Sequence, residues 1–163
     1  MRERREDASM KSIVFVCHGN ICRSPMAEAV FRDMLDRRGL TARYQVDSAA
    51  VSAEELGNPV YPEAQAELVR RGLPRSVHRA WQLCRADYDR YDYFLCMDMD
   101  NLRRMRVIFG GDPQRKTGLL LSYTNRPREV EDPWYTGRFD FVFDEISEGC
   151  CAFLDELLRV EGV

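Results

Sequence analysis

Short apolar runs alternate with amphipathic stretches along this chain of 163 residues. The runs at 12–17, 44–50, 91–97 and 118–123 are apolar and carry β-branched or aromatic residues, which is typical of buried strands. Apolar residues recur at helical spacing in 24–39, 61–72, 101–109 and 139–157. Because strands and helices alternate, the pattern predicts an α/β fold. We expect a single three-layer domain, with a four-stranded parallel sheet and helices on both faces.

Local signals mark the ends of the first helix and the limits of the domain. Ser24 is expected to cap that helix, with Pro25 at its first position and Gly39 at its end. The polar, proline-bearing segment 124–138 is too irregular to predict an element. We expect residues 11–163 to form one domain, preceded by a disordered extension at 1–10.

Composition limits the classes of partner. The formal net charge is −3, so the overall field does not favour nucleic acid, and any anion site has to be built locally. No apolar run approaches the ~20 residues of a membrane-spanning helix. Six cysteines in a chain of this length indicate free thiols in a reducing compartment, so we expect a cytoplasmic protein. The cysteine spacing is not that of zinc ligands, and no metal is expected.

The segment from Cys17 to Ser24 carries the strongest chemical signal. It follows the first strand and leads into a helix, which is where ligands bind in an open α/β sheet. Successive backbone N–H groups of such a loop can form a nest for a tetrahedral anion, and the helix adds the positive end of its dipole. The sequence therefore predicts a phosphate-binding loop after the first strand, formed by Cys17, His18, Gly19, Asn20, Ile21, Cys22, Arg23 and Ser24.

Three residues of this loop suggest a reaction. Gly19 permits backbone conformations that a side chain would obstruct, and the planar guanidinium of Arg23 can hold two phosphate oxygens. The positive surroundings also favour a thiolate at Cys17, which would be a nucleophile aimed at phosphorus. The alternative is a buried structural thiol beside a surface arginine. The spacing Cys-x5-Arg-Ser between a strand and a helix favours the covalent phosphoryl-transfer site.

The motif "VCHGNICRSP" resembles the signature loop of the low-molecular-weight protein tyrosine phosphatases. The resemblance continues through "DSAAVS", "GNP", "GLPRSVHRA", "YDYFLCMDMDN" and "EDPWYTG" in the family's order. It implies an enzyme that hydrolyses phosphotyrosine in proteins, and small aryl phosphates, through a cysteinyl-phosphate intermediate, with inorganic phosphate as product. No metal or organic cofactor is expected, because the nest supplies the positive charge. A monomer capable of weak self-association is expected.

The resemblance also assigns roles outside the loop. Asp132, which Pro133 restricts to extended conformations, is the expected general acid and base. Trp134 and Tyr135 would form an aromatic wall of the substrate slot. Behind the nest, the resemblance implies a polar network of Asn20, Ser24, Ser48 and His78, in which Ser24 hydrogen-bonds the leaving thiolate and His78 supports the loop without exchanging substrate protons.

Three positions depart from the family pattern, and one cysteine has an open role. Trp134 stands where the family usually has tyrosine, a mild departure that preserves the aromatic surface. Glu54 stands where an aromatic residue is common on the substrate wall, and it should disfavour acidic peptides. His18 replaces a frequent leucine, and at the rim it would make activity sensitive to pH near neutrality. Cys22 is either a small loop residue or a redox partner that forms a reversible disulfide with Cys17, the role that the resemblance favours.

Three other functions compete on the same loop. Arsenate reductases relay electrons through further cysteines placed close together, whereas Cys96 here has no close partner in sequence. Protein-arginine phosphatases resemble this loop but typically carry threonine where this chain has Ile21. A phosphotyrosine-binding module without activity would have lost Cys17 or Asp132, and both are present.

Overall fold

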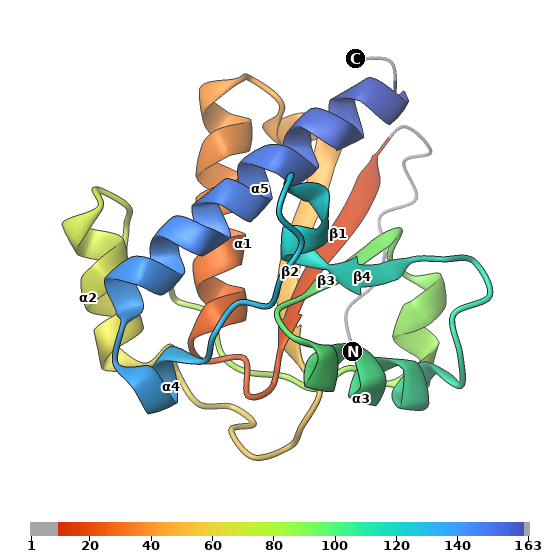
Figure 1. Cartoon of the computed structure of the whole chain (residues 1–163), viewed down its shortest axis with the longest axis horizontal. Coiled ribbons are helices and arrows are strands. Elements are labelled where there is room, and N and C mark those ends of the chain that lie inside the picture. Colours follow the sequence, from red (N-terminus) through yellow and green to blue (C-terminus); the bar gives the residue numbers. More distant parts are fainter. Residues whose placement is uncertain (1–9, 162–163) are drawn as a thin grey trace.

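Four parallel strands form the centre of the computed structural model, which describes residues 10–161 (Figure 1). The strands are β1 (Lys11–Cys17), β2 (Tyr44–Ala50), β3 (Tyr93–Cys96) and β4 (Thr117–Leu119), in the spatial order β2-β1-β3-β4. The register pairs Cys17 with Ala50 and Val16 with Cys96. The carboxyl ends of β1, β2 and β3 therefore lie at one edge of the sheet.

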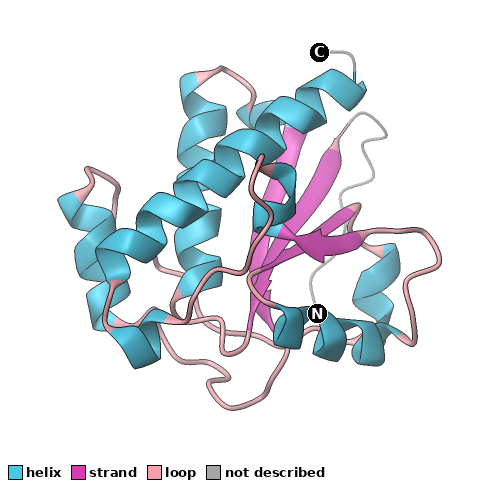
Figure 2. Cartoon of the chain, viewed as in Figure 1, coloured by secondary structure: helices cyan, strands magenta, loops and turns pink. Residues whose placement is uncertain are grey.

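Helices cover both faces of this sheet, which gives three layers (Figure 2). One face packs against α1 (Arg23–Arg37), α2 (Pro62–Arg70) and α5 (Phe139–Glu161), and the other against α3 (Met99–Phe109) and the 3₁₀ turn η2 (Arg85–Asp89). A short helix α4 (Pro133–Thr136) and the 3₁₀ turns η1 (Thr41–Arg43) and η3 (Leu120–Tyr123) complete the elements. The predicted α/β fold with a parallel sheet is confirmed.

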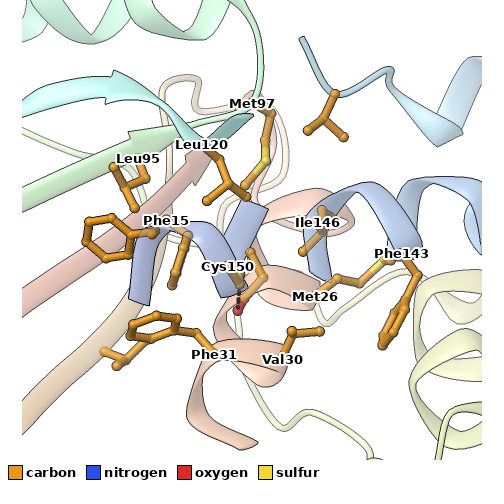
Figure 3. Close-up of a cluster of buried hydrophobic side chains, with 14 of the residues drawn as sticks. Phe15, Met26, Val30, Phe31, Leu95, Met97, Leu120, Phe143, Ile146 and Cys150 are labelled. Carbon is orange, nitrogen blue, oxygen red and sulfur yellow. Dashed lines mark hydrogen bonds between the residues drawn. The ribbon is translucent and has the colours of Figure 1, made fainter. Parts of the chain in front are cut away.

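Strand β1 is buried on both sides and separates two cores. Ile13 and Phe15 face the larger core with α1 and α5, whereas Val14 and Val16 face the smaller core with α3. Figure 3 shows part of the larger core, where Cys150 of α5 donates a hydrogen bond to the carbonyl oxygen of Ala27 in α1. Because both faces of β1 are packed, the loop that follows it has a rigid base.

Three local predictions need correction. The run 118–123 is a strand only as Thr117–Leu119, because Leu120 and Leu121 turn into a 3₁₀ helix that packs on α5. A side-chain carbon on Gly149 of α5 would lie only 2.6 Å from Leu120 Cγ, so this contact needs glycine. The segment 124–138 contains α4, which begins at Pro133.

The third correction concerns the start of α1. Helix α1 begins at Arg23, with Cys22 at the N-cap position, so Ser24 lies inside the helix and does not cap it. The predicted disordered extension lies outside the described residues except for Met10, which is buried. No helix between residues 10 and 161 is both long and apolar enough to span a membrane.

Candidate active site

A pocket of about 160 Å³ opens at the carboxyl end of β1. Its lining comes from the loop after β1, the loop after β2 and the segment around α4, and consists of Cys17, His18, Gly19, Ile21, Cys22, Arg23, Glu54, Glu55, Asp132, Trp134 and Tyr135. The predicted catalytic residues thus meet at one place, although 109 positions separate Arg23 from Asp132.

Cys17 is the buried nucleophile candidate. The backbone N–H of Asn20 donates to its Sγ at 3.3 Å, and the Ser24 hydroxyl lies 3.0 Å from the same sulfur. The N-terminus of the 15-residue helix α1 lies beside the loop and contributes its dipole. Each of these groups stabilises negative charge on the sulfur.

Arg23 is buried and held by acidic partners. Its Nη1 donates to Asp98 Oδ2 at 2.7 Å and to the Val130 carbonyl oxygen at 3.0 Å, and its Nη2 lies 3.4 Å from Asp132 Oδ2. Burial opposes the charged form, but the negative charges of Cys17, Asp132 and Asp98 outweigh burial and raise the pKa of Arg23 above its ordinary value. The guanidinium therefore stays charged and fixed in orientation.

Asn20 fixes the shape of the loop from behind. Its backbone has a φ of 63°, a left-handed conformation that asparagine tolerates better than most residues. Its side-chain Nδ2 donates to Ser24 Oγ at 2.7 Å and to Ser48 Oγ at 3.1 Å. Its Oδ1 lies 2.7 Å from His78 Nε2 and accepts from the Trp81 backbone N–H at 3.3 Å. These contacts join the loop to β2 and to the segment 78–81.

The same network continues to Glu28 on α1. The Ser48 hydroxyl donates to Glu28 Oε1 at 2.7 Å, and His78 Nδ1 lies 3.6 Å from that oxygen. The side chain of His78 is only 6% exposed and does not line the pocket. His78 therefore lies behind the loop and outside the pocket lining, and its supporting role stays a prediction.

Asp132 reaches the pocket from the turn before α4. Its Oδ1 accepts from the Trp134 backbone N–H at 3.0 Å, so Asp132 caps α4. The Val130 backbone N–H donates to the carbonyl oxygen of Met97 at 2.8 Å, which ties this segment to the end of β3. The carboxylate is therefore held near Arg23 without being buried, since 29% of the side chain is exposed.

Aromatic side chains form one part of the pocket lining. Trp134 packs on Tyr61 with ring centroids 4.8 Å apart, and Tyr61 stacks on Phe139 at the start of α5. Trp134 and Tyr135 remain 51% and 84% exposed, so their rings are free to contact a ligand. A flat leaving group fits such a surface.

Two of the residues that depart from the family pattern contact each other. His18 Nε2 lies 3.0 Å from Glu54 Oε2, and both side chains line the pocket. His18 is thus at the rim, as the sequence predicts. Its effect on the pH dependence of activity stays a prediction.

Cys22 lines the same pocket as Cys17, and both thiols are free. Burial, followed by the nearby negative charges of Cys17 and Asp132, raises the pKa of the Cys22 thiol far above its ordinary value. The Cys22 thiol is therefore held in its neutral form.

Sequence reasoning missed three residues that complete this site. Asp98 binds Arg23, Glu28 binds Ser48, and Glu55 lines the pocket. Glu28 had a local signal, because it lies one helical turn after Ser24. Asp98 lies two residues after the end of β3, and only the strand order shows that β3 is the neighbour of β1. Among residues 10–161, no cluster of three or more His, Cys, Asp or Glu residues could hold a metal ion.

Comparison with known proteins points to one family. The model of the low molecular weight phosphotyrosine protein phosphatase family matches residues 12–161. A protein of that name from Pongo abelii is 40% identical over 155 residues, covering 92% of this chain and 98% of the relative.

Two solved structures share the fold. The crystal structure of YfkJ from Bacillus subtilis has a TM-score of 0.89 and 38% identity, covering 94% of this chain and 98% of that chain. The structure of a drosophila arginine phosphatase has a TM-score of 0.80 and 33% identity, covering 91% of this chain and 98% of that chain.

Proposed function

Because the chain belongs to the low molecular weight phosphotyrosine protein phosphatase family, we propose that it hydrolyses phosphotyrosine in proteins, and small aryl phosphates, to inorganic phosphate. One observation carries the proposal for this chain. The buried sulfur of Cys17 lies in a pocket that also contains the fixed guanidinium of Arg23 and the carboxyl group of Asp132.

The first step transfers the phosphoryl group to Cys17. The thiolate attacks phosphorus, so that an S–P bond forms while the bond from phosphorus to the phenolic oxygen breaks. Arg23 and the backbone N–H groups of the loop bind the phosphoryl oxygens, on which charge is spread in the transition state. The carboxylic acid of Asp132 gives its proton to the departing oxygen.

The second step releases phosphate. Asp132, now a carboxylate, takes a proton from a water molecule whose oxygen attacks phosphorus, and the S–P bond breaks. The hydroxyl of Ser24, 3.0 Å from the sulfur, donates a hydrogen bond to the thiolate that leaves. The proposed sequence of steps requires no metal ion and no organic cofactor.

Cys22 is proposed to protect the nucleophile from oxidation. A peroxide would convert the Cys17 thiolate to a sulfenic acid, and the Cys22 thiol would then attack that sulfur and release water. The resulting disulfide is reopened by a thiol reductant. Once Cys17 is a neutral sulfenic acid, one of the charges that raise the pKa of Cys22 is gone, while burial, the largest cause, remains.

The location and assembly of the protein are finer proposals. All six cysteines lie among the described residues and none of them forms a disulfide, which fits a reducing compartment such as the cytoplasm. The exposed rings of Trp134 and Tyr135 would support weak self-association of an otherwise monomeric enzyme.

A protein-arginine phosphatase is the second candidate, since a structural neighbour is named an arginine phosphatase. The apolar side chain of Ile21 in the pocket favours an aromatic ester over a guanidinium group. Parallel assays with a phosphotyrosine peptide and a phosphoarginine peptide decide between the two substrates.

The test of the proposed function is phosphate release from a phosphotyrosine peptide in EDTA with a thiol reductant, for the wild type and for Cys17→Ser. Turnover by the wild type and none by the variant is the expected result. A folded wild type that leaves the peptide intact would overturn the proposal. Turnover of phosphoarginine, or reduction of arsenate, by that same preparation would then identify the alternative.

A further inference from the structure

Two carboxylates at the pocket have no role in the proposed reaction. Glu54 and Glu55 lie in the loop after β2 and line the same pocket as Cys17 and Asp132. The side chain of Glu54 is 69% exposed, so its charge is available to a residue beside the bound phosphotyrosine. Because the ligand of this site is itself an anion, the negative charge of these two carboxylates does not serve to bind the phosphate.

Hydrogen bonds hold the loop of Glu54 and Glu55 against the phosphate-binding loop. The backbone N–H groups of Val51 and Ser52 donate to the carbonyl oxygens of Cys17 and His18, each at 3.1 Å. The Ser52 hydroxyl donates to the same oxygen of His18 at 2.9 Å. The position of both carboxylates is therefore set by the loop that binds phosphate.

Each carboxylate is also held individually. Asn58 Nδ2 donates to Glu55 Oε2 at 2.6 Å, and a side-chain carbon on Gly19 would lie 3.2 Å from Glu55 Cγ. Glu54 contacts His18 Nε2 at 3.0 Å. Preorganised carboxylates lose less side-chain entropy when they bind a cation than freely rotating ones do.

His18, Glu54 and Glu55 form a rim of the pocket, and the charge of this rim is negative whether or not His18 is protonated. A neutral His18 leaves the full charge of both carboxylates, and a protonated His18 offsets Glu54 but leaves Glu55. The guanidinium of Arg23 lies deeper, against Asp98 and Asp132, where it faces the phosphate site. A lysine or arginine beside the phosphotyrosine would therefore be attracted, and a glutamate or aspartate repelled.

We propose that Glu54 and Glu55 make this enzyme select phosphotyrosine flanked by basic residues and discriminate against phosphotyrosine in acidic sequences. The proposal rests on the proposed phosphotyrosine phosphatase function and names its substrate class. Solvent-exposed charge pairs are individually weak, so attraction to one peptide and repulsion from the other together correspond to about a tenfold ratio in kcat/KM at low salt.

The experiment compares two peptides of equal length, in which phosphotyrosine is flanked on each side by two lysines or by two glutamates. The kcat/KM ratio between them is measured at low salt and at 0.5 M NaCl, with 4-nitrophenyl phosphate as an unflanked reference substrate. The wild type is expected to favour the lysine peptide about tenfold at low salt, and salt should reduce this ratio towards one.

Matched variants assign the effect to the rim. The double variant Glu54→Gln/Glu55→Gln should bring the ratio close to one, and because the ratio is taken within one variant, a change in overall turnover cancels. The control Asp36→Asn/Asp155→Asn removes two exposed carboxylates from α1 and α5 and should keep the wild-type ratio.

Failure of the inference and failure of the proposed function give different results. Equal kcat/KM for both peptides in a wild type that turns over 4-nitrophenyl phosphate overturns the selectivity alone. So does a ratio that stays unchanged in Glu54→Gln/Glu55→Gln. A folded wild type that hydrolyses neither peptide nor 4-nitrophenyl phosphate overturns both the function and the selectivity.

Discussion

The carboxylate of Asp98 binds Arg23 and also caps the N-terminus of helix α3. Its Oδ2 accepts from Arg23 Nη1 at 2.7 Å, and its Oδ1 accepts from the Asn101 backbone N–H at 2.8 Å, which caps α3. The residue that orients the phosphate-binding guanidinium is therefore itself anchored by secondary structure. This arrangement couples the position of α3 to the geometry of the pocket.

Replacing Asp98 by asparagine should separate these two roles. Asparagine is as good an N-cap as aspartate, so α3 is retained, but the charge that holds Arg23 is lost. Because a hydrogen bond to a charged group contributes about 1.5–3 kcal/mol, we expect kcat/KM for a phosphotyrosine peptide to fall between about tenfold and a hundredfold. Steady-state kinetics measures this change.

A carboxylate on the same helix provides the control. Asp100 pairs with Arg103 and Arg104 on the exposed surface of α3. Asp100→Asn should leave kcat/KM near the wild-type value, since surface ion pairs contribute little. Wild-type kinetics in Asp98→Asn would show that Asp98 does not position Arg23.

If Asp132 is the proton donor, the loss of activity on replacing it should depend on the leaving group of the substrate. Asp132→Asn cannot donate a proton, so kcat should fall by roughly 10² to 10⁴ for phosphotyrosine, whose phenol needs protonation to depart. The loss should be smaller for 4-nitrophenyl phosphate, because its leaving group is stable as an anion. Phosphate release from both substrates measures the difference, and equal losses for the two would contradict the assignment of Asp132.

Oxidation tests the proposed role of Cys22. After treatment with hydrogen peroxide and then with dithiothreitol, the wild type should recover most of its activity, whereas Cys22→Ser should recover much less, since the Cys17 sulfenic acid is then oxidised further. Cys84→Ser is the matched control, because Cys84 lies outside the pocket. Equal recovery in all three proteins would make Cys22 only a small loop residue. Thiol titration before and after peroxide counts the thiols consumed.

The lowered pKa of Asp112 makes the stability of the folded protein depend on pH. Burial opposes ionisation of its carboxyl group, but hydrogen bonds from Thr117, Tyr88 and the Lys116 backbone N–H outweigh burial and lower the pKa of Asp112 below its ordinary value. The stabilisation is therefore fully present above the unfolded-chain pKa of about 3.9 and is lost as the pH falls through the lower pKa of the folded state.

Urea unfolding across the acid range measures this contribution. At pH 7 we expect Asp112→Asn to lower the free energy of unfolding by about 1–3 kcal/mol, because Asp112 is 10% exposed and holds the turn before β4. The difference from the wild type should shrink below pH 4. A difference that stays constant down to pH 2 would mean that the charge of Asp112 contributes nothing.

The sequence alone predicted the part of the site whose residues lie close together in the chain. Cys17 and Arg23 lie six residues apart in one loop, so their spacing alone predicts that they meet at an anion site. The role of Asp132 as general acid was predicted from the resemblance to the family motif and not from physical reasoning, because many other carboxylates could have filled that role. The short helix α4 was missed, although Asp132 followed by Pro133 is a helix start signal.

What could not be predicted depends on tertiary packing. Asp98 reaches Arg23 only because β3 lies beside β1, and strand order is not encoded in any local pattern. The early end of β4 follows from the close approach of Gly149 to Leu120, two residues far apart in sequence. The contact between His18 and Glu54 likewise needs two loops to be placed side by side.

The partners of Arg23 also determine when the enzyme becomes competent during its own synthesis. The nucleophile loop leaves the ribosome early, but Val130 and Asp132 follow 107 and 109 positions after Arg23. At bacterial or eukaryotic rates of about 5–20 residues per second, this interval is on the order of 5–20 s. A nascent chain therefore carries Cys17 and Arg23 for seconds before Val130 and Asp132 are available to complete the site, and the first turnover follows the docking of the last third of the chain.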